Sequence, residues 1–180
     1  MENLYIDKVE NEVWSGYIVA TDRGLSFVSH ETSNINEVIA WQIKHYPDSK
    51  LISDSEIIVP YKKQFEEYLA GERFEFDFPI DVKGTPFQQE VWDILYKIPY
   101  GETRSYLDIA FEMGRDQKST QAVGGAVGSN PISLVCPCHR VVGSDGSLTG
   151  YSGGIENKKA LLNHEIEYRI GNLSNNEPVA

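Results

Sequence analysis

Short apolar runs broken by turn-forming residues dominate the start of the chain. Residues 13–20 form one such run and residues 25–28 form a second, and both contain the β-branched and aromatic side chains that favour strands. The segment Thr21–Gly24 between them combines a charged pair with a glycine, which is typical of a tight turn. This arrangement predicts a β-hairpin near the N-terminus.

Helical spacing of apolar residues replaces this pattern over residues 36–46 and 60–70. A proline follows the first of these segments and a glycine follows the second, and both residues stop helices. Residues 72–80 then alternate apolar and polar positions, which predicts another strand. These elements indicate a small α/β unit over residues 1–82.

A second pattern begins at Gly84, where the chain breaks and restarts as a helix. Thr85 has the side chain of an N-cap, and Pro86 suits the first helical position. The helix predicted over residues 86–97 places its aromatic and aliphatic residues on one face. The run Pro99-Tyr100-Gly101 then predicts a tight turn.

Two short helices joined by a glycine-containing turn come next. We expect the first to begin after the capping residue Ser105 and to end at Gly114, and the second to run from about residue 119 to Gly128. Such a pair forms a helix-turn-helix, a motif that proteins use to contact DNA. Residues 132–135, which follow it, are predicted to form a buried strand leading to the cysteines.

Charge is distributed unevenly along this acidic chain. The 180 residues have a net charge of -11, which argues at first against a nucleic-acid partner. Residues 1–83 carry a net charge of -8 and residues 84–169 only -2, so the second half can present a local basic face. Composition is equally compatible with scattered, solvated charges. The candidate cations for such a face are Arg115, Lys118, Arg140, Lys158 and Lys159.

Composition narrows the class of protein further. Hydrophobic content of 41% suits a globular fold, and no apolar run is long enough to cross a membrane. Cys136 and Cys138 are separated by one proline and cannot bridge distant segments, which indicates a reducing, cytoplasmic setting. The cysteines and histidines match no zinc-binding spacing, so we expect no metal. The polar segment 171–180 is expected to be a disordered tail.

The run Pro137-Cys138-His139-Arg140-Val141 is the strongest candidate for chemistry. A thiol becomes a good nucleophile only as a thiolate, and a neighbouring imidazole is a common way to obtain one. A carboxylate bonded to that imidazole fixes its tautomer and stabilises its cation. Glu165 is the candidate carboxylate, although only the fold could bring it to the cysteine. His164 is an alternative partner that spacing leaves open.

Four nearby features allow a structural or a functional interpretation. Asn130, before Pro131, is predicted to hold a turn by bonding to the backbone. Tyr106 is either a core aromatic or a phenol directed at a ligand. The loop Gly150-Tyr151-Ser152-Gly153-Gly154 is either an ordinary surface loop or one that closes over a flat ligand. Cys136 is predicted to be a small buried hydrophobe.

In their order along the chain, these motifs resemble the O6-alkylguanine-DNA alkyltransferases, also called methylated-DNA–protein-cysteine methyltransferases. The matching stretch runs from Gly84 to Glu165 and includes Phe87-Gln88, Val91-Trp92, Ile98-Pro99-Tyr100-Gly101, Ser105-Tyr106, Ala122-Val123-Gly124, Asn130-Pro131, Pro137-Cys138-His139-Arg140-Val141, Gly150-Tyr151-Ser152-Gly153-Gly154 and Leu161-Leu162. The resemblance implies a helix-turn-helix, winged-helix-like domain over 83–170 that carries the cysteine. Residues 1–82 resemble the family's ribonuclease-H-like first domain more weakly.

The resemblance also implies a DNA repair reaction that each molecule performs once. The helix pair would bind duplex DNA, and the damaged nucleotide would rotate out of the stack into a pocket. Cys138, as a thiolate, would take the alkyl group from O6 of guanine, or from O4 of thymine. A chain from Glu165 through His139 and a water would remove the thiol proton. Tyr106 would donate a hydrogen bond or a proton to the departing guanine.

Further contacts with the substrate are implied in the same way. The alkylated base would contact Asn130, Pro137, Val141, Tyr151, Ser152 and Lys158. The DNA would contact Tyr106, Arg115, Lys118, Gln121, Ala122, Gly124 and Arg140. We expect a monomer that binds duplex DNA containing O6-alkylguanine or O4-alkylthymine, with no membrane partner and with neither a metal nor an organic cofactor.

Gln121 departs from the family pattern. Members of the family usually carry an arginine immediately before Ala-Val-Gly, where it fills the space of the flipped base, whereas this chain has a glutamine. Glutamine lacks the charge and has a shorter reach. We therefore expect weaker DNA binding or base extrusion, unless Arg115 or Lys118 compensates.

Two functions of other classes remain open from the residues. A non-catalytic sensor of alkylated bases would bind the lesion without modifying it, and Gln121 is the feature that favours this alternative. A cysteine hydrolase would use Cys138 and His139 with an oxyanion hole and would turn over repeatedly. Turnover number separates the hydrolase from the alkyl acceptor, and an S-alkyl adduct separates the acceptor from the sensor.

Overall fold

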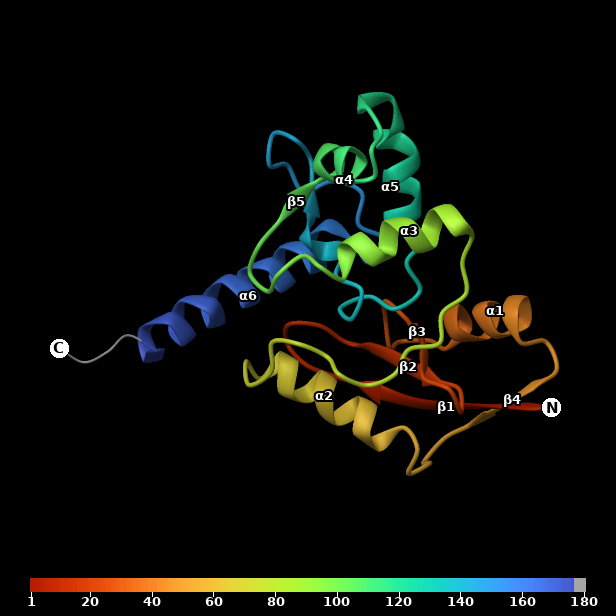
Figure 1. Ribbon diagram of the computed structural model, residues 1–180. Helices are drawn as coiled ribbons and strands as arrows, with labels where there is room; N and C mark the ends of the chain where they lie inside the picture. The colour runs from red at the N-terminus through yellow and green to blue at the C-terminus, as the bar shows by residue number, and fades with distance from the viewer. Residues whose placement is uncertain (177–180) are drawn as a thin grey trace.

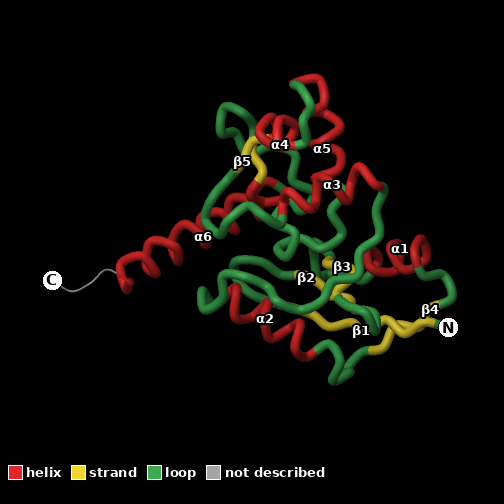
Figure 2. Tube along the Cα trace, in the orientation of Figure 1, coloured by secondary structure: helices red, strands yellow, loops and turns green. Residues whose placement is uncertain are grey.

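The chain folds into an N-terminal part built on a β-sheet and a C-terminal part built mainly from helices (Figure 1). The computed structural model describes residues 1–176. Figure 2 shows the longer strands gathered in the N-terminal part, with the helical part stacked against it. This mixed α/β architecture is the one that the sequence predicts.

The N-terminal sheet has four strands in the order β3-β2-β1-β4. β1 (Glu2–Val9) pairs antiparallel with β2 (Gly16–Ala20) and parallel with β4 (Ser49–Ile52). β2 pairs antiparallel with β3 (Leu25–Val28), which confirms the predicted hairpin.

The pattern of hydrophobic and polar residues predicts neither β1 nor β4. β1 buries Leu4, Tyr5 and Ile6 in succession, because both faces of this central strand are covered. Its sequence therefore lacks the alternation of a half-exposed strand. β4 is only four residues long and gives too short a signal.

Two helices cover the two faces of this sheet. α1 (Asn36–His45) contributes Val38 to a cluster with Leu4 and Ile6, whereas α2 (Val59–Leu69) packs against the opposite face. Both helices lie where the apolar spacing predicts them.

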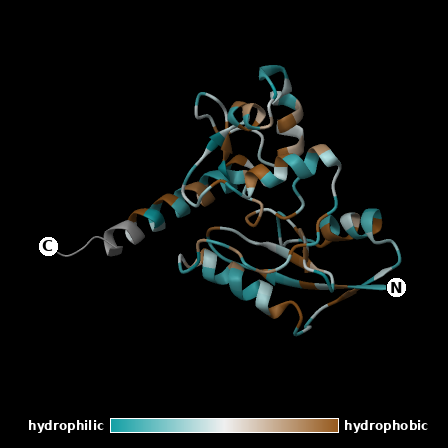
Figure 3. Ribbon diagram, in the orientation of Figure 1, coloured by the Kyte–Doolittle hydropathy of each residue, from teal (hydrophilic) through white to brown (hydrophobic). Residues whose placement is uncertain are grey.

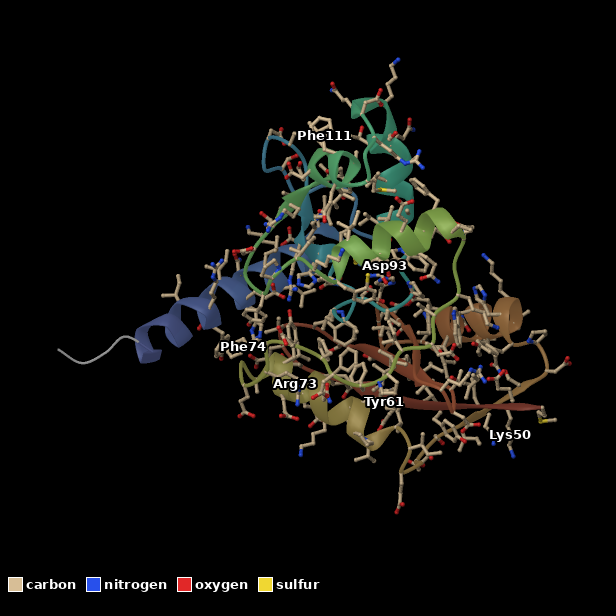
Figure 4. The ribbon with its side chains drawn as sticks, viewed as in Figure 1. Lys50, Tyr61, Arg73, Phe74, Asp93 and Phe111 are labelled. Atoms are coloured by element: carbon tan, nitrogen blue, oxygen red, sulfur yellow. The ribbon has the colours of Figure 1, made fainter. Side chains whose placement is uncertain are left out.

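The prediction of a strand over residues 72–80 is wrong. This segment is irregular apart from an isolated bridge between Leu25 and Ile80. Figure 4 labels Arg73 and Phe74 at its start, beside α2. The aromatic rings at alternate positions pack on aromatic side chains of α2 and on Tyr100, so the alternation reflects contacts with side chains and not a place in the sheet.

The helical part contains α3 (Pro86–Leu95), α4 (Tyr106–Glu112) and α5 (Thr120–Gly128). The starts of α3 and α4 are fixed locally, since Thr85 and Ser105 both form reciprocal capping boxes. The Trp92 indole nitrogen donates to the Ala126 carbonyl at 2.8 Å, which ties α3 to α5. These helices confirm the predicted helix-turn-helix.

The remaining elements hold the cysteine between α5 and the last helix. A 3-10 helix, η2 (Cys138–Arg140), leads into β6 (Val141–Val142), which pairs in parallel with β5 (Arg104–Ser105). α6 (Ile155–Asn176) follows and projects from the body at its C-terminal end (Figure 1).

Two further expectations fail in this region. Residues 132–135 form a turn and not a strand: Asn130 bonds to both ends of the loop, and Leu134 has a φ of 72°. The expected disordered tail is helical as far as Asn176, because each added residue extends a helix already anchored by buried residues such as Leu161. Residues 177–180 lie outside the described residues.

A continuous hydrophobic core joins the two parts. Phe65 and Tyr68 from α2 belong to the same buried cluster as Trp92, Val123 and Leu161. Figure 3 shows apolar segments on elements of both parts. The described helices include none that is both long enough and apolar enough to span a membrane.

Candidate active site

The loop between α5 and η2 holds Cys138 in place. Asn130 donates from its amide nitrogen to the Cys136 carbonyl at 2.7 Å, and its amide oxygen accepts from the Ile132 backbone at 3.0 Å. Asn130 therefore bonds to the backbone at both ends of this turn, as predicted. Cys136 is fully buried, as predicted, and both cysteines are free thiols.

The Cys138 thiol lies almost completely inside the protein, with an exposed fraction of 6%. Burial raises the pKa of Cys138, and this outweighs hydrogen bonds with Asn130 and Ser133 and the charge of Lys158, which act in the opposite direction. The thiol is therefore protonated at rest. A nearby base must take its proton before the sulfur can attack.

Glu165 provides the carboxylate next to that base. It is fully buried, and its Oε2 lies 2.6 Å from His139 Nε2, so the predicted contact between these two residues is present. Because a carboxylate only accepts, the proton of this bond is on His139. Glu165 also accepts from the Tyr68 hydroxyl and from the Gly101 backbone nitrogen.

Burial acts to raise the pKa of Glu165, but the hydrogen bonds of His139 and Arg140 and the charge of the Arg140 guanidinium outweigh it. The pKa is held well below its usual range, and Glu165 is ionised. His164, the alternative partner, instead contacts the Tyr68 carbonyl through Nε2 at 2.9 Å.

His139 is fully buried and its Nδ1 has no hydrogen-bond partner among the described residues. Burial lowers the pKa of His139, and the nearby Glu165 charge only partly offsets this effect. The ring is therefore neutral at rest, with Nε2 protonated and Nδ1 free to accept. This is the protonation state that a base beside a thiol requires.

The prediction that Arg140 contacts DNA is wrong. Its side chain is 9% exposed, and it donates from Nε and Nη2 to Glu165 at 2.8 and 2.9 Å. Its Nη1 donates to the Ile98 carbonyl at 2.8 Å, and the guanidinium lies 5.6 Å from the Tyr100 ring. Each nitrogen of the guanidinium therefore donates a hydrogen bond to an acceptor inside the protein.

Tyr106 and Lys158 converge on one carbonyl near the cysteine. The Tyr106 hydroxyl and the Lys158 ammonium each donate to the Thr149 carbonyl at 3.0 Å. Lys158 is completely buried, and this desolvation lowers its pKa. Burial raises the pKa of Tyr106, and the negative charge of a Cys138 thiolate acts in the same direction, so the hydroxyl remains a proton donor.

The loop over residues 150–154 brings Tyr151 near the cysteine. Tyr151 is buried, and its hydroxyl has no hydrogen-bond partner among the described residues. Ser152 donates to the Gly128 carbonyl at 2.7 Å and thereby ties the loop to α5. Pro137 and Val141 flank η2 and are both buried.

Some of the predicted DNA-contacting residues of the helix pair line an open depression of about 470 Å³. Gln121 and Ala122 are exposed at the start of α5, and Gln121, Gly124 and Tyr106 line the depression. Lys118 is exposed in the turn before α5. The Arg115 guanidinium lies 5.1 Å from the Phe87 ring, outside the lining.

The sequence interpretation missed residues that reach the site from distant segments. Tyr68 comes from α2, and nothing in its helical spacing distinguishes it from a core aromatic. Ser133, also missed, lies close to Cys138 in the chain and is buried, and its one signal is that it interrupts an apolar run.

Comparisons with known proteins agree with this geometry. Residues 86–167 match the family model described as 6-O-methylguanine DNA methyltransferase, DNA binding domain. Residues 4–82 match the ribonuclease-like domain of the same family. A Bacillus subtilis protein named methylated-DNA–protein-cysteine methyltransferase, inducible, is 44% identical over 162 residues, covering 90% of each chain.

Comparison with solved structures indicates the same family. The crystal structure of Mycobacterium tuberculosis O6-methylguanine methyltransferase matches with a TM-score of 0.77 and 36% identity, over 92% of this chain and 94% of that one. The structure titled Mycobacterium tuberculosis OGT in complex with DNA matches with a TM-score of 0.76 and 35% identity, over the same shares of both chains, 92% and 94%. The chain described here therefore belongs to the 6-O-methylguanine DNA methyltransferase family.

Proposed function

We propose that this protein repairs DNA by transferring an alkyl group from O6 of guanine to Cys138. The observation that carries the proposal is the buried His139 ring, next to Cys138 in the chain, with Nε2 held by Glu165 and Nδ1 free to accept a proton. Family membership supports the reaction class, since the relatives are named for transfer of a methyl group from DNA to a protein cysteine.

The reaction begins with removal of the thiol proton. The proton passes from Cys138 to His139 Nδ1 through a water, and the resulting imidazolium is stabilised by Glu165. The thiolate sulfur then attacks the alkyl carbon as the bond between that carbon and O6 breaks. Tyr106 donates its hydroxyl proton to the departing guanine. Water cannot easily displace the thioether, so the protein acts once.

The base must leave the duplex to reach a thiol this deeply buried. The depression beside Tyr106 and Gln121 adjoins the loop that covers Cys138 and is the entry side for a flipped nucleotide. Asn130, Val141, Tyr151, Ser152 and Lys158 lie in or against the loops around Cys138 and form the walls of the base pocket. O4-alkylthymine presents the same kind of alkyl–oxygen bond and is a second substrate in this proposal. A reducing cytoplasm suits the free thiol.

Stoichiometry tests this function. An excess of duplex DNA carrying a labelled methyl group on guanine O6 is mixed with protein, and label on the protein is counted. We expect it to saturate at about one methyl per molecule, to vanish in Cys138→Ser and to persist in the matched variant Cys136→Ser. Repeated turnover would indicate a hydrolase, and binding without label would indicate a lesion sensor; either result overturns the proposal.

A further inference from the structure

Tyr68 connects the N-terminal part of the protein to the catalytic carboxylate. It lies near the end of α2, which Figure 1 shows in the N-terminal part, and its hydroxyl donates to Glu165 Oε2 at 2.5 Å. Tyr68 is fully buried, so this bond is shielded from water. Burial raises the pKa of Tyr68 well above its usual value, and the Glu165 charge acts in the same direction. The hydroxyl therefore keeps its proton and acts as a donor.

Contacts on several sides hold the Tyr68 ring in this position. Its backbone carbonyl accepts from His164 Nε2 at 2.9 Å, and the two rings lie 5.6 Å apart. The Phe76 ring lies 5.4 Å away, and the Tyr100 ring meets Tyr68 edge-on at 6.0 Å. The hydroxyl is thus held at the carboxylate by packing against residues of both parts of the chain.

Tyr68 shares the Glu165 oxygen that faces the catalytic histidine. Oε2 accepts from His139 Nε2 at 2.6 Å, from Arg140 Nη2 at 2.9 Å and from the Tyr68 hydroxyl. Oε1 instead accepts from Arg140 Nε at 2.8 Å and from the Gly101 backbone nitrogen at 3.1 Å. Because the hydroxyl directs the positive end of its dipole at Oε2, it offsets part of the negative charge that acts on His139.

Removing the hydroxyl could change the position of the carboxylate or its effective charge, and the contacts favour the second effect. Arg140 bonds to both oxygens and the Gly101 backbone bonds to Oε1, so three donors fix the carboxylate without Tyr68. His139 would then experience more of the negative charge. This charge stabilises an imidazolium much more than a neutral imidazole, so it would make His139 a stronger base.

We propose that Tyr68 is a positioning residue that limits the basicity of His139 by competing for Glu165 Oε2. Less of the Cys138 proton then passes to His139 in the free protein, while Tyr68 keeps its own proton throughout. This inference rests on the alkyl transfer proposed above, in which that proton transfer generates the nucleophile. Because each molecule acts once, a thiolate formed before DNA arrives would be lost to oxidants and other electrophiles.

Other charged and titratable groups face this network from neighbouring elements. Burial lowers the pKa of His139, and the charges of Arg140 and Lys158 act in the same direction. The Tyr100 hydroxyl has no hydrogen-bond partner among the described residues, and His164 bonds to a backbone carbonyl. On the cysteine side, the titratable groups are Tyr106, Tyr151 and Lys158. All of these groups remain in place when the phenol hydroxyl at Oε2 is removed.

The reactivity of Cys138 across a pH series tests this role. Iodoacetamide reacts with the thiolate and needs no DNA, so the rate of Cys138 modification is followed by peptide mass mapping from about pH 5 to about pH 10. Single-turnover methyl transfer from a duplex containing O6-methylguanine is measured over the same range. Both rates are compared between the wild-type protein and Tyr68→Phe, which keeps the ring and removes only the hydroxyl.

We expect Tyr68→Phe to raise both rates about tenfold near neutral pH, which corresponds to one unit in the pKa of His139. Burial lowers the pKa of His139 and raises that of Cys138, so near neutral pH the thiolate forms by proton transfer between them. The two proteins should converge at acid pH, where His139 is protonated in both. They should converge again at alkaline pH, where the thiol ionises without His139.

Tyr61→Phe is the matched control. It removes a hydroxyl from the same helix, and Tyr61 is buried but makes no hydrogen bond with Glu165 in the described structure. Its rates should equal those of the wild-type protein. An unchanged or lower neutral rate in Tyr68→Phe overturns the proposal, and so does a change of equal size at every pH, which indicates a structural role.

A second replacement gives a result even if Tyr68→Phe fails to fold. Incorporation of 3-fluorotyrosine at position 68 alone makes the phenol more acidic and its hydrogen bond to Glu165 stronger. The neutral rate should then fall below that of the wild-type protein, and a rise overturns the proposal. Absence of methyl transfer in the wild-type protein would refute the proposed function instead, because the iodoacetamide profile does not depend on it.

Discussion

Replacing Arg140 by methionine removes the cation that neutralises the buried Glu165 carboxylate. Arg140 makes two hydrogen bonds to Glu165 and one to the Ile98 carbonyl, all between 2.8 and 2.9 Å. Methionine has a similar length and fills the space with apolar atoms. Glu165 then keeps only His139, Tyr68 and the Gly101 backbone as partners.

The expected loss is large because a buried charge is left without its main counter-ion. Breaking such a pair from one side costs about 3–5 kcal/mol of the free energy of unfolding. For a chain of this length each kcal/mol shifts Tm by about 2–4 °C, so Arg140→Met should lower Tm by about 6–20 °C. The matched variant Arg104→Met removes an arginine whose side chain is 42% exposed beside Glu102. It should cost at most about 1 kcal/mol.

The pH dependence of the stability difference provides a second test of the Arg140→Met prediction. The pKa of Glu165 is depressed in the folded wild-type protein, so its ionisation stabilises the fold above the unfolded pKa of about 4.3 and this contribution is lost as the pH falls. In Arg140→Met the folded pKa rises, since burial is no longer offset. The stability gap between the two proteins should therefore narrow at acid pH.

Thermal and urea unfolding at neutral and acid pH measure this gap directly. A loss in Arg140→Met no greater than that in Arg104→Met at neutral pH would refute the reasoning. So would a gap of constant size across the pH series, because it would show that the Glu165 charge is not what Arg140 stabilises.

Three further predictions concern DNA binding, chemistry and folding. Gln121→Arg adds a cation at the exposed start of α5. The slope of log duplex affinity against log salt concentration should become steeper by about 0.9, and an unchanged slope measured by fluorescence anisotropy contradicts this. Tyr106→Phe should slow single-turnover methyl transfer about a hundredfold with duplex affinity retained, and a wild-type rate would remove Tyr106 from the mechanism. Ser105→Ala removes a capping box and should cost about 1 kcal/mol in urea unfolding, which an unchanged midpoint would disprove.

Local signals in the sequence located the helices well. Thr85 and Ser105 cap helices through bonds to residues three positions ahead, so the information lies within one turn of the chain. The apolar spacing of α2 and α3 is equally local. Because these capping signals do not depend on the rest of the fold, the starts of α3 and α4 could be predicted.

Elements defined by distant contacts could not be predicted in the same way. Residues 72–80 alternate like a strand because their aromatic rings pack on α2 and Tyr100, and residues 132–135 are mostly apolar because the loop is buried. Arg140 is a cation next to the active-site histidine, which made it a candidate for a DNA contact. Its guanidinium instead turns inward to Glu165, 25 positions along the chain. Tyr68 reaches the site only through the docking of the sheet against the helical part.

The site of alkylation tests the central claim most directly. The protein is incubated with a duplex containing O6-methylguanine, digested, and mapped by mass spectrometry. We predict a methyl group on Cys138 and none on Cys136, which is fully buried and whose pKa burial raises strongly. Methylation of Cys136, or an unmodified Cys138 in protein that has consumed the lesion, would contradict the account.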